Sequence, residues 1–150
     1  MNLDVIPANG GETLWVVADR IRFLGGLPGS NLELLDIEVP PGSGTPPHTH
    51  LSPEMFHILE GELTVREFGA GSAPRTVLAG PGTAVRIPSM LPHNYSNDSG
   101  GPVRMLVLIE KTMIDFFRDI GAAEPQGEPD FAKIGAAMRR HGIEPLTMAA

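Results

Sequence analysis

The chain of 150 residues is 41% hydrophobic, which suits one sizeable core and is short for two ordinary domains. Its formal net charge of −7, with no stripe of basic residues, argues against nucleic acid or an anionic membrane as the main partner. The absence of cysteine excludes thiolate metal ligands, disulfide bonds and cysteine nucleophiles.

The first residues lack the basic head and apolar run of a secretion signal, and no stretch approaches the roughly 20 apolar residues of a membrane-spanning helix. We therefore expect a cytoplasmic protein. From residue 13 onward, short apolar segments alternate with turn residues such as Gly25-Gly26 and Glu60-Gly61. They predict about eight strands, at residues 13–19, 31–39, 54–59, 62–68, 75–78, 83–87, 93–96 and 103–110. The strands on either side of Glu60-Gly61 are predicted to form a hairpin.

Two histidines and a glutamate lie close together in the middle of the chain. His48 and His50 are two residues apart, so in an extended segment both side chains point to the same face. A straight strand would carry Glu54 roughly 13 Å beyond His50, at about 3.3 Å per residue, too far to share a metal ion. The intervening Ser52-Pro53 favours a bend, because proline does not fit inside a central strand. The sequence therefore predicts that Glu54 lies beside the two histidines, on the next strand.

A third histidine, His93, lies in a distant predicted strand and can join the other three residues only if the sheet curls on itself. Imidazole and carboxylate ligands suit divalent Fe, Mn, Ni, Co, Cu or Zn. We therefore predict one divalent metal ion on His48, His50, Glu54 and His93. The predicted fold is all-β, because about eight strands in Greek-key order lose their exposed edges by closing into a double-stranded β-helix, or jelly roll.

After residue 110 the pattern becomes helical. Thr112 is predicted to cap a helix over residues 113–120, with Asp115 in its first turn. Asp130 is predicted to cap a second helix that ends at Arg140.

We accordingly divide the chain into a β-barrel at residues 1–110 and C-terminal helices at residues 111–150, packed on the barrel within the same domain. The apolar faces of these helices need a surface to cover them. That surface is the outside of the barrel, a second protomer, or the barrel mouth, over which the helices would form a lid.

The two histidine-containing blocks resemble the two sequence motifs of the cupin superfamily. The first motif has a glycine, His-x-His, a glutamate and a second glycine, and these positions are Gly42, His48, His50, Glu54 and Gly61. The second is matched by Gly82, Pro88, His93 and Asn97. Met90 stands where the family has glycine, although methionine does not readily adopt the positive φ that glycine permits. The resemblance implies a cupin barrel with a divalent metal on three histidines and a glutamate.

Nearly the whole chain resembles a narrower group, the bacterial quercetin dioxygenase-like single-domain cupins. The resemblance extends from Gly11-Glu-Thr-Leu-Trp-Val, through the histidine motif, to Phe-Phe-Arg at 116–118 and Arg-His-Gly-Ile-Glu-Pro-Leu at 140–146. It implies oxygenase chemistry as the leading interpretation. It also implies a homodimer, because single-barrel cupins commonly pair through outer sheet faces or exchanged N-terminal strands.

A substrate pocket is predicted beside the metal, lined by the inward-facing side chains of Phe56, Ile58, Met90, Tyr95 and Leu106. Such an apolar pocket suits a small aromatic or otherwise carbon-rich compound. Glu54 is the candidate catalytic residue, because it is the only acid in the cluster and could act as a general base. Tyr95 shares a face with His93 and is predicted either to donate a hydrogen bond to it or to fill space.

We therefore expect a dioxygenase-like oxidoreductase that uses a divalent metal ion to act on a small enolisable or phenolic compound. The alternatives are a non-catalytic cupin that binds or senses a small molecule, and a metal-assisted isomerase or lyase. The remaining histidines are assigned structural roles. His57 is predicted to point to the outer face of the barrel, and His141 to interact with the dipole at a helix C-terminus.

Overall fold

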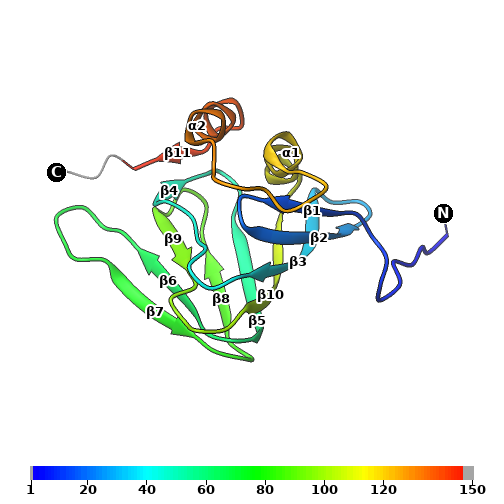
Figure 1. Ribbon diagram of the computed structural model, residues 1–150, viewed down its shortest axis with the longest axis horizontal. Coiled ribbons are helices and arrows are strands. Elements are labelled where there is room, and N and C mark those ends of the chain that lie inside the picture. Colours follow the sequence, from blue (N-terminus) through cyan, green and yellow to red (C-terminus); the bar gives the residue numbers. More distant parts are fainter. Residues whose placement is uncertain (1, 147–150) are drawn as a thin grey trace.

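Two antiparallel sheets and two helices make up residues 2–146, the part of the chain that the computed structural model describes (Figure 1). The first sheet has the strand order β1-β2-β3-β10-β5-β8, and the second has the order β11-β4-β9-β6-β7. The strands are β1 (Thr13–Val16), β2 (Asp19–Gly26), β3 (Leu32–Val39), β4 (His48–Thr49), β5 (Glu54–Glu60), β6 (Leu63–Glu67), β7 (Arg75–Ala79), β8 (Ala84–Ile87), β9 (His93–Ser96), β10 (Val103–Glu110) and β11 (Glu144–Pro145). The helices are α1 (Lys111–Ile120) and α2 (Phe131–Arg140). The predicted all-β class with a short C-terminal helical segment is confirmed; residues 147–150 of that segment lie outside the described residues.

The core lies between the two sheets, where alternate side chains of each strand meet. On β10, Val103, Met105, Val107 and Ile109 are buried, whereas the residues between them are more exposed. On the neighbouring β3, Leu35 and Ile37 are buried opposite Val107 and Met105. This alternation follows from the two-residue period of a strand and gives each sheet one apolar face.

The segment predicted as one strand at residues 13–19 forms two elements. Val17 has a positive φ of 56°, and the chain reverses there into β2, which pairs with both β1 and β3. Gly25 and Gly26, predicted as a turn, instead pair with Leu34 and Glu33 at the end of β2. A sequence pattern does not separate a glycine in a turn from a glycine at an irregular strand end, because the backbone freedom of glycine serves both.

The predicted hairpin at Glu60-Gly61 is wrong, because the strands on either side belong to different sheets. β5 pairs with β10 and β8, whereas β6 pairs with β7 and β9. Gly61 is therefore a corner at which the chain crosses between the sheets. It has a φ of 82°, and a Cβ atom there would lie 2.5 Å from the carbonyl oxygen of Pro102. Only glycine fits this corner without displacing backbone.

The first helix begins earlier than predicted. It starts at Lys111, directly after β10, so Thr112 lies inside the helix and Asp115 lies beyond its first turn. The N-cap residue is Glu110, whose side chain makes no capping hydrogen bond. The second helix has the predicted cap, because Asp130 Oδ1 accepts a hydrogen bond of 3.1 Å from the backbone N–H of Lys133.

The helices cover one end of the space between the sheets (Figure 1). Met113, Phe116 and Ile120 of α1 and Met138 of α2 are buried and line a cavity there. Of the three surfaces considered for their apolar faces, the barrel mouth is therefore the one they cover. After α2 the chain returns to the second sheet, where β11 pairs with β4. Within residues 2–146, neither helix has the length and apolar character needed to cross a bilayer.

Met90, which replaces the glycine of the second motif, adopts the backbone conformation expected of that glycine. Its φ is 65°, in the left-handed region, and its backbone N–H donates a hydrogen bond of 2.9 Å to the carbonyl oxygen of His50. Its side chain is 45% exposed. The turn that connects β8 to β9 thus has the conformation expected with glycine and is hydrogen-bonded to the segment that follows β4. The cost is backbone strain at Met90.

We expect Met90→Gly to raise the free energy of unfolding by about 0.5–1 kcal/mol. Glycine removes the cost of about 1–2 kcal/mol that a residue with a Cβ atom has in the left-handed conformation. It also makes the unfolded chain more flexible, which reduces this gain by about 0.5–1 kcal/mol. Urea unfolding measures the change. Met90→Ala is the control, since it removes the exposed side chain and keeps a Cβ atom at positive φ. A glycine variant no more stable than the alanine variant would show that the turn is unstrained.

Candidate metal centre

The four predicted ligands converge from both sheets. His48 on β4 lies directly opposite His93 on β9 in the second sheet, and His50 follows β4. Glu54 begins β5 in the first sheet. The chain crosses between the sheets at Ser52, whose buried hydroxyl donates to the Pro53 carbonyl at 2.7 Å and accepts from the Glu110 N–H at 3.0 Å.

One hydrogen-bond pattern orients all three imidazole rings. The Nδ1 atoms of His48, His50 and His93 lie 2.6–2.7 Å from backbone carbonyl oxygens two residues away in the chain, those of Pro46, Ser52 and Leu91. A carbonyl oxygen only accepts, so each Nδ1 carries the proton and donates. This fixes the tautomer and leaves each Nε2 as the atom available to a metal ion.

The distances between the ligand atoms fit a single ion. The available nitrogens of the three histidines lie within 4.8 Å of one another. Glu54 Oε1 is 2.9 Å from His93 Nε2 and 3.4 Å from His50 Nε2. Two ligand atoms about 2.1 Å from one ion are separated by about 3.0 Å at a right angle and about 3.4 Å at the tetrahedral angle. Because Nδ1 of His93 already donates and a carboxylate only accepts, the close approach of Glu54 to Nε2 requires a cation between them, either a proton or a metal ion.

The electrostatics of the cluster favour neutral imidazole at one ligand and an ionised carboxylate at another. Burial lowers the pKa of His48 to about 4. Burial alone would raise the pKa of Glu54, but hydrogen bonds and charge from His50 and His93 lower it to about 2. Burial opposes protonation of His50, yet the Glu54 carboxylate raises the pKa of that residue. A divalent cation would take over the role of these protons, which is the behaviour expected of a metal site.

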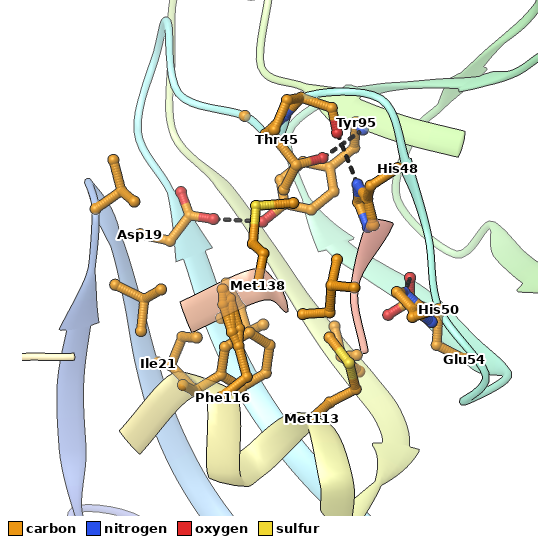
Figure 2. A pocket seen from close by; sticks show the side chains of 18 of the residues that line it. Asp19, Ile21, Thr45, His48, His50, Glu54, Tyr95, Met113, Phe116 and Met138 are labelled. Carbon is orange, nitrogen blue, oxygen red and sulfur yellow. Dashed lines mark hydrogen bonds and ion pairs between the residues drawn. The ribbon is translucent and has the colours of Figure 1, made fainter. Parts of the chain in front are cut away.

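An apolar cavity lies next to the four residues (Figure 2). The cavity has a volume of about 120 Å³, whereas one water molecule on the same measure needs about 10–15 Å³. The sheets contribute Ile21, Ile37, Phe56, Met105 and Val107 to its walls, and the helices contribute Met113, Phe116, Phe117, Ile120, Ile134 and Met138. It therefore has room for a small organic molecule in contact with the metal ligands.

The residues predicted to form the substrate pocket divide into two groups. Phe56 and Tyr95 line the cavity and meet edge to face, with ring centroids 5.7 Å apart. Ile58, Met90 and Leu106 do not line it. Ile58 is fully buried further along β5, and Leu106 points to the opposite face of β10 from its neighbours Met105 and Val107. Met90 is exposed in its turn.

Asp19 is a cavity residue that the sequence did not reveal. It is buried at the start of β2, where Ser43 Oγ donates to its Oδ1 at 2.6 Å and the Tyr95 hydroxyl donates to its Oδ2. Tyr95 therefore donates to Asp19, which differs from both roles considered for it, a hydrogen bond to His93 and filling space. Burial raises the pKa of Asp19 to about 6, although both hydrogen bonds oppose the shift. Burial and the nearby Asp19 raise the pKa of Tyr95 well above its ordinary value, which keeps its hydroxyl protonated as a donor.

The other two histidines lie away from the cluster. His57 is exposed on β5, between the buried Phe56 and Ile58, as the two-residue period predicts. His141 follows the last turn of α2, and its Nε2 lies 2.9 Å from Asp119 Oδ2 on α1.

The family model for the cupin domain matches residues 35–109, and these residues are half of the chain. The chain therefore belongs to the cupin family, as its two motifs predicted. The matched segment contains all four metal-site residues and ends where α1 begins. A comparison with curated protein sequences found no match.

Several solved structures share the fold. The polyketide cyclase RemF from Streptomyces resistomycificus is 26% identical, with a TM-score of 0.61 over 73% of this chain and 80% of that one. Recombinant oxalate oxidase in complex with glycolate is 23% identical, with a TM-score of 0.53 over 63% of this chain and 51% of that one. Hydroxypropylphosphonic acid epoxidase from S. wedmorenis is 17% identical, with a TM-score of 0.58 over 72% of this chain and 59% of that one. The similarity to the oxidase and the epoxidase concerns the fold.

We expect His50→Ala to abolish retention of a divalent metal, because it removes one of the three nitrogens and leaves Glu54 without one of its two histidine partners. Elemental analysis of protein purified without chelator measures the metal content. His141→Ala is the matched control, since it removes an imidazole outside the cluster, and it should retain the metal. Equal metal content in the two variants would mean that His50 is not a ligand.

We also expect acid to release the metal below the ordinary imidazole pKa of about 6.5, more steeply than one proton would allow, because three imidazoles bind as neutral groups. The fold favours neutral His48, because burial lowers the pKa of this residue to about 4. The contribution of neutral His48 to the free energy of unfolding is therefore fully present above pH 6.5 and is lost as the pH falls towards 4. Metal binding adds to the same trend, because the ion stabilises the folded state.

The melting temperature of the metal-loaded protein should therefore fall across this pH range, and added metal should partly restore it. The double variant His48→Ala/His93→Ala should lack the metal-dependent part. Melting curves with the same pH response in the presence and absence of metal would contradict the assignment.

Proposed function

We propose that this cupin is a dioxygenase-like oxidoreductase that uses one divalent metal ion to act on a small enolisable or phenolic compound. The observation that carries the proposal is the position of His48, His50, Glu54 and His93 at the wall of an apolar cavity that two helices help to line. A ligand in this cavity would contact the metal site and lie against apolar side chains. The protein thus provides metal ligands and a hydrophobic binding surface in one place.

A bound divalent ion would lower the pKa of an enol or phenol and, if it is redox-active, exchange electrons with the substrate and dioxygen. The chain's own residues hold and shield the reacting group. Phe56, Met105 and Phe116 present apolar surface to it and exclude water, which strengthens electrostatic interactions in the cavity. The backbone carbonyls that accept from each Nδ1 keep the imidazoles in position.

Glu54 is proposed as the general base as well as a metal ligand. Its pKa of about 2 keeps it ionised at neutral pH, as both roles require. The same low value makes it a weak proton acceptor while His50 and His93 remain beside it. Proton abstraction by Glu54 therefore requires that its carboxylate separate from these two residues, which would raise its basicity because burial alone favours the protonated form.

The comparisons support metal-dependent chemistry on a small molecule. One solved form of the epoxidase carries Fe(II) with an alternative substrate, and oxalate oxidase was solved with glycolate. The cyclase RemF, which shares 26% identity, favours a second candidate function. In that case the metal serves only as a Lewis acid in a non-oxidative rearrangement, isomerisation or elimination of a carbon-rich ketone, and no oxygen is consumed.

Oxygen uptake tests the proposal. We expect protein loaded with iron, manganese, nickel, cobalt or copper to consume oxygen with at least one member of a panel of phenols and 1,3-diketones. Zinc-loaded protein and His50→Ala should not consume it. Substrate turnover with zinc and without oxygen uptake would favour the Lewis-acid function. Binding without turnover for every metal would indicate a non-catalytic cupin.

A further inference from the structure

The cavity has polar groups in two separate places, and the metal ligands are only one of them. Asp19 and Tyr95 form the other, and Figure 2 shows them joined by a hydrogen bond, with His50 and Glu54 on the opposite side of the view. The other side chains that line the cavity are mainly aliphatic, aromatic and methionine side chains. We call Asp19, Ser43 and Tyr95 the carboxylate site.

Asp19 is a buried acid without a cationic partner. Among residues 2–146, no lysine, arginine or histidine nitrogen lies within 4.0 Å of its carboxylate; its hydrogen-bond partners are the hydroxyls of Ser43 and Tyr95. A carboxylate in apolar surroundings is unfavourable unless it is compensated. An uncharged acceptor could accept the hydrogen bonds from the Ser43 and Tyr95 hydroxyls equally well. These two hydrogen bonds therefore do not explain why an acid lies at this position.

The carboxylate retains capacity to bind something in the cavity. Each carboxylate oxygen has two acceptor positions, and each accepts one hydrogen bond from the protein. The turn that precedes Asp19 holds Val17, a β-branched residue, at a φ of 56°. Both residues line the cavity. The turn and the two hydroxyls therefore fix the carboxylate at the cavity wall with acceptor positions still unused.

We propose that Asp19 binds a hydroxyl or amino group of the ligand, at the end remote from the part that contacts the metal. Tyr95 and Ser43 act as positioning residues for this carboxylate. The inference rests on the proposed function, because it assumes that one end of the ligand lies at the metal. The ligand class is then a small carbon-rich molecule with a chelating enol–ketone or phenol at one end and a hydrogen-bond donor at the other.

Two related compounds test this assignment in binding, without any need for turnover. Kojic acid carries an enol–ketone pair and, across its ring, a hydroxymethyl group. Allomaltol has the same ring and chelating pair, with a methyl group in that place. We expect zinc-loaded protein at pH 7.5, above the pKa of Asp19, to bind kojic acid at least about tenfold more tightly by calorimetry, as expected for one hydrogen bond to a charged group.

Three variants locate the source of this preference. Asp19→Asn should reduce it below about threefold while the affinity for allomaltol stays within about twofold of the wild type. Asp115→Asn, which removes an exposed carboxylate on α1, should keep the preference. Tyr95→Phe should reduce the preference by less than Asp19→Asn does, because the carboxylate remains but loses one of the two hydroxyls that position it. A purely structural role for Asp19 predicts that neither probe distinguishes the variants.

The outcomes separate the two proposals. Equal affinity of the wild type for both probes, or a preference that survives in a folded Asp19→Asn variant, overturns the role of Asp19 and leaves the metal-centred function standing. Failure of zinc-loaded protein to bind either chelator would overturn the proposed function. If Asp19→Asn does not fold, which its melting curve reveals, the wild-type comparison of the two probes decides the inference alone.

Discussion

The site depends on one constraint, which is that ligands from two different sheets reach the same point. His48 and His93 are fixed relative to each other by their direct pairing between β4 and β9. Glu54 arrives from the other sheet through the bend at Ser52-Pro53, which is tied to the end of β10 by the hydrogen bond from Glu110 to Ser52. A shift of one residue in either pairing would turn a ligand to the opposite face of its sheet. The barrel therefore sets the geometry of the cluster, and the carbonyl oxygens that accept from each Nδ1 set the orientation of its rings.

The helices give this site its chemical environment. Methionine and phenylalanine side chains of α1 and α2 line the cavity beside the histidine cluster. Burial in such surroundings disfavours the charged form of a side chain, as the lowered pKa of His48 and the raised pKa of Asp19 show. The cavity thus combines one positively charged centre, when a metal is bound, with one buried carboxylate. This arrangement favours ligands that have two polar ends and an apolar middle.

The sequence predicted the parts of the structure that depend on local spacing. The His-x-His pair, the proline bend before Glu54 and the alternation on β10 each follow from strand geometry, and they led to the fold and to the metal cluster. The failures are at places where tertiary pairing decides. Glu60-Gly61 has the composition of a hairpin turn, but its strands enter different sheets. Asp19 gave no signal, because a single acid at the end of the strand predicted at residues 13–19 is typically exposed, and only the packing of β2 against Ser43 and Tyr95 buries it. Leu106 is predicted to face inward, but Met105 and Val107 on either side of it face the cavity, so Leu106 faces the opposite way.

The central claim is that one divalent ion is bound by three imidazoles and the carboxylate of Glu54. X-ray absorption spectroscopy of metal-loaded protein tests it most directly, because the spectrum reports the atoms around the ion. We expect one ion per chain, with the multiple-scattering pattern of three imidazoles and with nitrogen and oxygen neighbours at about 2.0–2.2 Å. A spectrum with oxygen neighbours only, or with a single imidazole, would contradict it.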